Sequence, residues 1–256
     1  MSVWLDGVAL ESIDPAIRLK GVLIGAVETT EITSQYAKYG GLRYLGQTEN
    51  SRKVKITFKG LDSDPARREQ ALCGVLDWAR GTRLELLQRP EQYLTVRCTG
   101  GPSLELVRDY AAKDITVQFT AFDPDFKAKY PTVATLSAAA GAAATATLTP
   151  PGTQDITFLE AEVRNDGETA MNALTLSVGG RSFAYTGLGL AAGKTLLIAR
   201  DGDGRLTMTA DGVSVLDKRT PESDDDLILL QRQMNTVTVL AERACAVKLL
   251  ARGQYR

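Results

Sequence analysis

The groups that most often carry catalysis near neutral pH are missing from this sequence. None of its 256 residues is a histidine. This removes the commonest general base, together with the serine–histidine–aspartate and cysteine–histidine arrangements. It also removes a frequent zinc ligand. Carboxylates are therefore the first groups to weigh as catalytic or metal-binding candidates.

Glu160 and Glu162 are the strongest candidates for carboxylate chemistry. They flank Ala161 on an expected strand, so both side chains lie on one face, roughly 7 Å apart. Glycosidases place two carboxylates at a comparable separation. The plainer interpretation is a solvent-facing side of a strand whose opposite side carries Leu159 and Val163. We favour this interpretation and predict no catalytic residue.

Two acidic segments could be taken for cation sites. Asp201 and Asp203 alternate with glycines, but the twelfth position of a calcium loop would be Gly212, and the flanks resemble strands. We therefore expect a hairpin turn there, and we predict neither a metal nor a cofactor. The second segment, interpreted as a solvated loop, comprises Glu222, Asp224, Asp225 and Asp226.

Composition indicates an ordinary soluble protein without electrostatic bias. The 30 Lys and Arg residues balance 31 Asp and Glu residues, and 44% of the chain is hydrophobic. Nucleic-acid binders usually have a basic patch or a high pI, so specific phosphate recognition is not expected. No signal peptide is recognisable, and no apolar run reaches the roughly 18 residues of a membrane span. We expect cytosolic synthesis and reduced cysteines in or near a core: Cys73, Cys98 and Cys245.

The first half of the chain predicts a sheet covered by one helix. In 53–59, apolar and polar residues alternate strictly, which is typical of a half-buried strand. Asp64 and Pro65 favour a helix start, and Gly81 supplies a stop, so a helix is expected from about Pro65 to Arg80. Trp78 borders its apolar stripe and should anchor it to the sheet. The stripe comprises Leu72, Val75, Leu76 and Ala79.

A long segment from Thr29 to Arg52 separates two of the expected strands. It contains Tyr36, Tyr39 and Tyr44. Long loops with their own aromatic residues are uncommon in compact domains and are often functional. Two interpretations remain open. The segment is either a hairpin whose tyrosines pack locally or an arm that reaches a neighbouring subunit, with the three tyrosines as interface candidates.

The second half begins after a change in composition. An alanine-rich stretch at 135–147 precedes two prolines and a glycine. Gly141 and the flanking Thr residues favour an extended linker or an edge strand over a helix there. We therefore predict a first domain at 1–131, an Ala/Pro-rich linker at 132–152 and a second domain at 153–256. Short apolar runs in the second domain are separated by Gly-containing turns such as Asp211-Gly212. This pattern favours a β-sandwich.

The order of elements between about 20 and 130 resembles one known family. A charged strand leads into a helix that ends near Trp78, and later strands lead to a closing motif with an Asp-Pro pair. The residues of that motif are Phe119, Asp123, Pro124 and Phe126. In these features the chain resembles the distal tail (Dit-like) proteins of long-tailed bacteriophages, which belong to the siphophage tail tip and baseplate hub.

The resemblance implies a mostly β protein. Its N-terminal domain would be a ring-forming β-sandwich or barrel-like fold with one covering α-helix, followed by a galectin-like C-terminal β-sandwich. Six copies would form a homohexameric ring in the virion tail tip, linking the major tail tube protein to the tail-tip hub. Receptor-binding or fibre proteins and a host saccharide are further implied partners, and DNA would pass through the ring without specific binding. Synthesis would occur in the bacterial host cytoplasm, without membrane insertion.

Two alternatives stay open beside this structural role. The first is a carbohydrate-binding, lectin-like β-sandwich, which favours aromatic side chains displayed on one sheet face. The C-terminal half has no Trp and few aromatic residues: Phe158, Phe183, Tyr185 and Tyr255. The second, weaker alternative is a glycoside hydrolase that uses Glu160 and Glu162.

Overall fold

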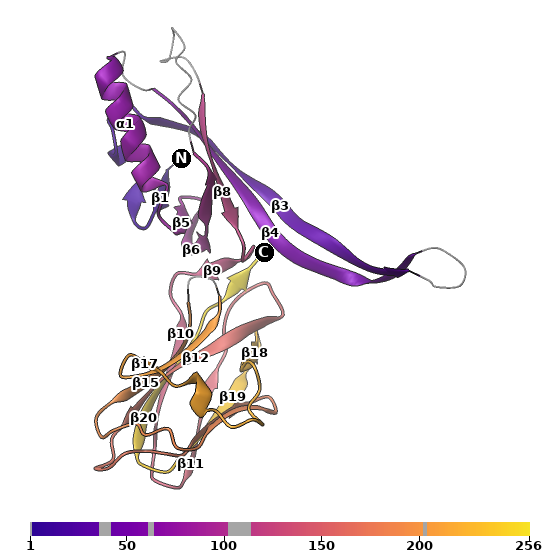
Figure 1. The fold of residues 1–256 in the computed structure, drawn as a ribbon, viewed down its shortest axis with the longest axis vertical. Coiled ribbons are helices and arrows are strands. Elements are labelled where there is room, and N and C mark those ends of the chain that lie inside the picture. The colour runs from indigo at the N-terminus through magenta and orange to yellow at the C-terminus, as the bar shows by residue number, and fades with distance from the viewer. Residues whose placement is uncertain (1, 36–41, 61–63, 102–113, 202–203) are drawn as a thin grey trace. The chain divides into compact units, whose positions relative to one another are not determined.

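The computed structural model describes residues 2–35, 42–60, 64–101, 114–201 and 204–256. The described chain is mostly β, with one α-helix, which confirms the expected fold class (Figure 1). It divides into two compact units, Met1–Phe126 and Lys127–Arg256. The division falls slightly before the boundary expected from the sequence.

Unit 1 contains two antiparallel sheets. One sheet has four strands in the order β3-β4-β8-β7. They are β3 (Arg18–Gln35), β4 (Leu42–Lys59), β8 (Ile115–Ala121) and β7 (Arg97–Gly100). The other sheet includes, in order, β2 (Val8–Ala9), β1 (Val3–Leu5), β5 (Arg83–Leu86) and β6 (Arg89–Thr95). The short strand β9 (Phe126–Ala128) spans the boundary between the units.

Helix α1 (Pro65–Trp78) begins and ends for local reasons that the sequence displays. The Asp64 carboxylate accepts a hydrogen bond from the Ala66 amide at 3.0 Å, and Pro65 occupies the first turn. The helix ends two residues earlier than predicted. Leu76 also differs from the prediction, because 39% of it is exposed although it was expected in the buried stripe.

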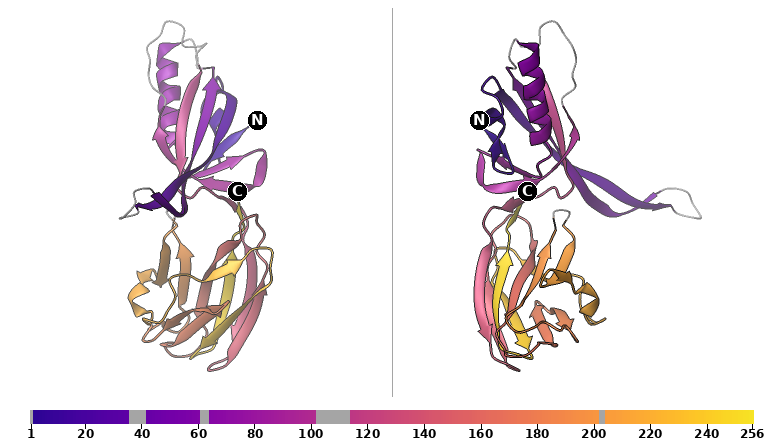
Figure 2. Two further views of the ribbon diagram at one scale, coloured as in Figure 1. Left: turned by 90° about the vertical axis from the view of Figure 1, so that its right-hand side faces the viewer. Right: turned by 60° about the vertical axis from the view of Figure 1, so that its left-hand side comes forward.

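The core of unit 1 lies between α1 and one face of the four-stranded sheet (Figure 2). Val54 and Phe58 of β4 are fully buried on that face. The Trp78 ring packs edge-on against Phe119 of β8, with centroids 6.0 Å apart. Its indole nitrogen donates to the Val8 carbonyl at 2.8 Å. The predicted role of Trp78 as an anchor is therefore confirmed.

Unit 2 is a β-sandwich of two antiparallel sheets (Figure 2). The first has the order β10-β20-β12-β15-β16-β17, with β18 (Ile228–Leu230) also paired to β12. Its strands are β10 (Thr132–Ala138), β20 (Cys245–Ala251), β12 (Ile156–Asn165), β15 (Thr195–Arg200), β16 (Leu206–Ala210) and β17 (Val213–Ser214). The second sheet comprises β11 (Ala143–Leu148), β19 (Asn235–Ala241), β13 (Leu174–Val178) and β14 (Arg181–Tyr185), and the unit ends in β21 (Gln254–Tyr255).

Alternating residues of both sheets form a single buried core in unit 2. The largest fully buried side chains there include Phe183 and Tyr185. The Tyr185 hydroxyl donates to the Met208 sulfur at 2.8 Å. Burial raises the pKa of Tyr185 far above its usual range, so this hydroxyl stays protonated.

A buried asparagine holds one end of this sandwich. Asn165, at the end of β12, is fully buried. Its amide nitrogen donates to the carbonyls of Thr169 and Leu190, each at 2.8 Å, and its side-chain oxygen accepts from the Gly167 amide at 3.0 Å. These bonds satisfy a polar side chain that would otherwise be costly to bury.

The linker predicted at 132–152 is wrong for most of its length. Residues Thr132–Ala138 form β10, which pairs with β20 along its whole length, and Ala143–Leu148 form β11, which pairs with β19. Each strand lies at the edge of a sheet. The inward-facing Ala134 and Ala146 pack against the core. Small side chains made the segment resemble a linker, whereas its pairing partners lie about 100 residues further along the chain.

All three cysteines are free thiols, but their placement only partly follows the prediction. Cys245 is buried, whereas Cys73 and Cys98 are exposed. The expectation that all three lie in or near a core is therefore wrong for the latter two. Among the described residues, no helix is long and apolar enough to cross a membrane.

Candidate assembly surfaces

The most unusual feature of unit 1 is the length of the β3–β4 hairpin. Each strand has 18 residues, whereas strands in globular proteins usually have 3–10. Most of the segment that was expected to be a long loop is therefore regular strand. The hairpin runs well beyond the end of β8 (Figure 1).

The outer half of this hairpin has no third strand within the described chain. β8 pairs with β4 only from Arg52 to Phe58, so Glu28–Gln35 and Leu42–Ser51 pair only with each other. We call these two segments the ribbon. At about 3.3 Å per residue, it extends roughly 25 Å. A lone two-stranded hairpin is marginally stable in water, so the ribbon would gain from a partner.

The described side chains of the ribbon cover no core. Ile32 is 45% exposed and Leu45 is 55% exposed. Thr29, Thr30 and Glu31 are exposed as well. β-Branched residues favour the extended backbone here, while the apolar side chains remain available for another surface.

Four irregularities interrupt the pairing of β3 with β4. One of them places Leu45 as an extra residue of β4, because Ile32 pairs with Gly46 and Thr33 pairs with Tyr44. Such bulges bend the strands and increase their twist. The hairpin is therefore a shaped element and not a flat extension of the sheet.

Of the three tyrosines proposed as interface residues, Tyr44 alone lies among the described residues. Tyr36 and Tyr39 lie outside the described residues. Tyr44 belongs to β4, where its backbone pairs with Thr33. The interface role of these three residues stays a prediction.

At the inner end of the ribbon, an ion pair links strands β3 and β4. Glu28 of β3 accepts from Lys53 at 2.7 Å and from the Ser51 hydroxyl at 3.0 Å, both on β4. The hydrogen bond from Lys53 is the main reason that the pKa of Glu28 lies below its usual value. This carboxylate therefore stays ionised across the neutral range.

The face of the four-stranded sheet opposite α1 is mostly polar, although the exposed Leu23 of β3 lies on it opposite Lys55. Lys53, Lys55 and Thr57 of β4 stand on it, beside Thr116 and Gln118 of β8. The hydroxyls of Thr57 and Thr116 lie 3.3 Å apart. Since the covered face holds the core, this second face is left for solvent or for another molecule.

Part of the positive charge at this sheet is neutralised locally. Asp114 forms ion pairs with Lys20 and Lys59. The hydrogen bond from Lys20 is the main reason that the pKa of Asp114 lies below its usual value, even though burial opposes the shift. The sheet therefore displays ammonium groups without a strong field of one sign.

The Phe126 motif that carried the family resemblance has a clear structural role. Phe126 is buried, and the guanidinium groups of Arg89 and Arg52 lie 4.3 and 5.5 Å from the centre of its ring. Cation–π contacts of this kind stabilise a desolvated arginine. Burial is the main cause that lowers the pKa of Arg52, while Asp125 opposes the shift.

Glu160 and Glu162 lie on the outer face of β12, opposite the buried Leu159, Ala161 and Val163. This is the arrangement expected of a solvent-facing side. Glu162 pairs with Lys248 of β20 at 3.2 Å. The structure therefore places the two carboxylates as a strand pattern predicts and gives one of them a cationic partner.

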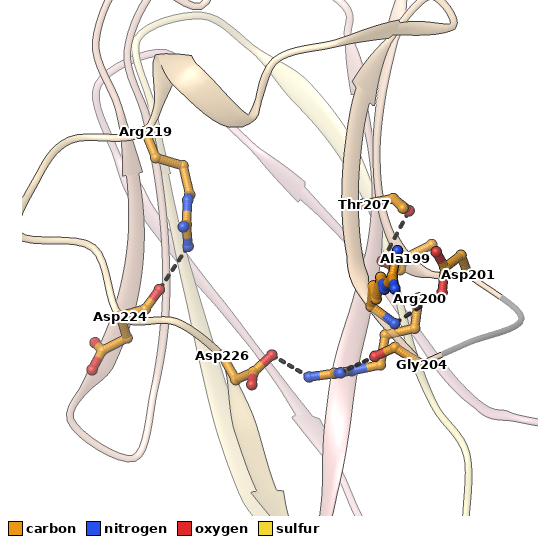
Figure 3. A network of polar contacts seen from close by, with 9 residues as sticks. Ala199, Arg200, Asp201, Gly204, Thr207, Arg219, Asp224 and Asp226 are labelled. Atoms are coloured by element: carbon orange, nitrogen blue, oxygen red, sulfur yellow. Dashed lines mark hydrogen bonds and ion pairs between the residues drawn. The ribbon is translucent and has the colours of Figure 1, made fainter. Parts of the chain in front are cut away.

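The acidic segments of unit 2 are engaged in hydrogen bonds and ion pairs (Figure 3). The Asp201 carboxylate accepts from the Arg205 amide at 2.9 Å and closes the turn, while Asp203 lies outside the described residues. Asp226 forms an ion pair with Arg200, and the Asp224 carboxylate accepts from the Ser182 amide at 2.7 Å. Among the described residues, no group of three or more potential ligands is arranged for a metal.

Sequence patterns did not indicate the contact that holds Arg200. Its guanidinium carbon lies 3.6 Å from the centre of the Phe158 ring, and it also donates to the Gly204 carbonyl. Arg200 thus ties the turn after β15 to the acidic loop through Asp226 (Figure 3). The acidic run expected as a free solvated loop is therefore fastened at several points.

Comparison with known proteins identifies the fold. No family model and no curated protein matches the sequence. Among solved structures, the chain has the fold of a phage baseplate and hub protein, which confirms the resemblance drawn from the first half. One such structure is the Dit protein of phage SPP1, described as a paradigm of the hub adsorption apparatus in phages that infect Gram-positive bacteria.

The likeness to SPP1 Dit spans both units. The TM-score is 0.66 at 13% identity, and the match covers 100% of this chain and 99% of that chain. A chain of the phage p2 baseplate, solved in its activated conformation with Sr, gives a TM-score of 0.52 at 9% identity, covering 98% and 96%. At these identities the comparison establishes the fold, and function has to be argued from this chain's own surfaces.

Proposed function

We propose that this chain is a structural protein of a phage tail tip, a distal tail protein that forms a hexameric ring. The ring joins the tail tube on one side to the tail-tip hub and adhesion apparatus on the other. The observation that carries the proposal is the ribbon without a third strand, on a chain that shares its whole-length fold with a hub protein.

The ribbon supplies the kind of contact that a ring needs. In a closed ring each subunit offers one surface and receives a different one. The ribbon is the offered surface, because Ile32 and Leu45 are exposed on it and its outer backbone edges have no partner in the described chain. In this proposal Tyr44 of β4 belongs to the contact, and Tyr36 and Tyr39, which lie outside the described residues, stay interface candidates.

The polar face of the four-stranded sheet lines the central channel in this proposal. α1 covers the other face, so only the face with Lys55 and Gln118 is open. Glu28 and Asp114 neutralise part of the charge of the lysines on this wall. Such a wall lets DNA pass without holding it, since DNA affinity grows with each unpaired cation placed against the phosphates.

The proposed function is tested by assembly of the purified full chain. We expect light scattering to show a hexamer or a dimer of hexamers, and negative-stain images to show an open ring. The double variant Ile32→Ser, Leu45→Ser should lose the ring. Val213→Ser, which changes an apolar residue of unit 2 that is 69% exposed, is the matched control and should keep it.

Two results would contradict the proposal. The first is a wild-type chain that remains monomeric at high protein concentration. The second is a ring that forms equally well in the double variant, which would remove the ribbon from the contact.

A further inference from the structure

The two sheets of unit 2 end in four edge strands. The larger sheet ends in β10 and β17, and the smaller sheet ends in β11 and β14. An edge strand presents unpaired amide and carbonyl groups that can recruit another strand, so folded proteins usually shorten, charge or cover their edges. Two of these four edges are protected in this way, and the other two are not.

The edges at β14 and β17 are closed. The Ala184 amide donates to the Ser223 hydroxyl at 2.9 Å, and the Ala184 carbonyl accepts from the Thr220 amide at 2.8 Å. Two residues earlier in β14, the Ser182 amide donates to the Asp224 carboxylate at 2.7 Å, and the Ser182 carbonyl accepts from the Asp224 amide at 2.9 Å. This loop therefore takes the place of a further strand beside β14. β17 has only two residues, which leaves little edge to pair.

The edges at β10 and β11 are open. β10 pairs along all seven of its residues with β20, and β11 pairs along all six with β19, in both cases without a register shift. On its other edge, neither strand forms a backbone hydrogen bond with the part of the chain that the structure describes. Neither strand contains a charged residue, a proline or a glycine. Both edges therefore lack the usual protection.

The sandwich core is also incompletely closed along this side. β10 and β11 follow each other in the chain and lie against each other. Ala134 and Leu136 of β10, and Ala146 of β11, pack against the core but are only partly buried. In the adjoining strand β20, the inward-facing Val247 is almost completely buried. A strand added beside β10 would therefore bury apolar surface that the edge leaves exposed.

The sequence of β10 is suited to pairing with itself. In an antiparallel pairing of two copies with a two-fold axis at Thr135, this residue meets its own counterpart, and Thr–Thr pairs are favourable cross-strand neighbours. Ala134 then faces Leu136 of the second copy on the inner side, and Val133 faces Ser137 on the outer side. A large side chain meets a smaller one in each of these pairs, and no charges are brought together. We therefore propose that unit 2 binds a second copy of this chain through antiparallel β10–β10 pairing, which continues the larger sheet across both molecules.

A second copy accounts for the open edge better than a strand of another protein. Two-fold pairing is isologous, because each copy offers and receives the same seven residues, so the contact closes after two molecules. The edge is then used up and no longer recruits unrelated extended chains. The pairing involves no residue of the ribbon, so it does not depend on the ring proposed above.

The experiment separates this contact from the ring by using the full chain with the ribbon double variant Ile32→Ser, Leu45→Ser. Sedimentation over a wide range of protein concentrations should show a monomer–dimer equilibrium. Adding Thr135→Lys should raise the dissociation constant at least about tenfold, since two ammonium groups then face each other across the axis, each beside its own Lys248. Thr195→Lys, at an exposed position three strands from β10, is the matched control and should dimerise as its parent does.

Cross-linking locates the contact. With the exposed Cys73 and Cys98 changed to Ser in the same double variant, Thr135→Cys should be joined into covalent dimers by a short bismaleimide, whereas Thr195→Cys should not. The inference is overturned if Thr135→Lys dimerises as tightly as its parent, or if the two cysteine variants cross-link equally fast. A ribbon double variant that stays monomeric at the highest concentration reached would also overturn it and leave the edge to a strand of another protein. A wild-type chain that forms dimers but no ring would count against the proposed function alone.

Discussion

The core of unit 2 and the ribbon of unit 1 are both built from paired antiparallel strands, yet they use side chains in opposite ways. In the sandwich, Leu176 faces Val239 across two strands, and both are fully buried. In the ribbon, Ile32 and Leu45 are about half exposed. Each strand has at least one paired neighbour in both regions, so the main difference lies in the layer that covers the side chains.

This difference indicates that a layer over the ribbon side chains would have to come from another molecule. A sheet face is buried in this chain only where another sheet or α1 lies over it. Hydrophobic burial provides most of the stability of a fold, and the ribbon has almost none of its own. Among those described, buried side chains lie only in the inner halves of the 18-residue strands, so contact with another molecule would supply the covering layer that the outer halves lack.

The largest expected effect comes from opening a cavity in the sandwich. Leu176→Ala should lower the free energy of unfolding of unit 2 by about 2–5 kcal/mol, because a fully buried leucine is removed. Chemical denaturation of the full chain measures it. Thr238→Val, on the outer face of the neighbouring strand, is the control and should change it little. A loss below about 1 kcal/mol would break the contrast between the two regions.

A smaller effect is expected at the root of the ribbon. The folded pKa of Glu28 is depressed, so its contribution is present above its unfolded pKa of about 4.3 and is lost as pH falls through the folded value. Glu28→Gln should therefore speed hydrogen exchange in the ribbon at pH 7. The difference from wild type should vanish in strong acid. If Glu28→Gln and the wild type exchange at equal rates at pH 7, the ion pair does not hold the two strands together.

The smallest effect on stability is expected within the ribbon itself. Leu45→Ser should change the unfolding free energy of the isolated chain by no more than about 0.5 kcal/mol, since its side chain is 55% exposed. Thermal unfolding at low protein concentration measures this. A large destabilisation would mean that Leu45 packs within its own chain, and the ribbon would then be an ordinary part of the fold.

Local sequence patterns predicted the elements that have one face buried against another part of the same chain. The alternation around Val54 and Phe58 gave a strand, and the Asp64 cap gave the start of α1. The sequence left the ribbon open between a locally packed hairpin and an arm, because Thr29–Glu31 and their neighbours have no buried side to produce alternation. The alanine-rich strand β11 stayed open between a linker and an edge strand because its partner, β19, lies far along the sequence.

The candidate sites depended even more on distant residues. Glu162 was recognisable as half of a carboxylate pair, but its partner Lys248 lies 86 residues away and became visible only through strand order. Asn165 gave no signal, because a single asparagine near a turn ordinarily forms part of that turn. Its burial between Thr169 and Leu190 is a property of the closed sandwich.

The irregular pairing of the β3–β4 hairpin has a further consequence for how the molecule avoids indiscriminate aggregation. A long, straight, uncovered edge is a template for indiscriminate aggregation, because any extended chain can add to it residue by residue. Here no stretch of the pairing continues for more than four residues before the register shifts. An incoming strand can pair along this edge only if it has matching register shifts. The bulges therefore favour a complementary surface and disfavour pairing with unrelated extended chains.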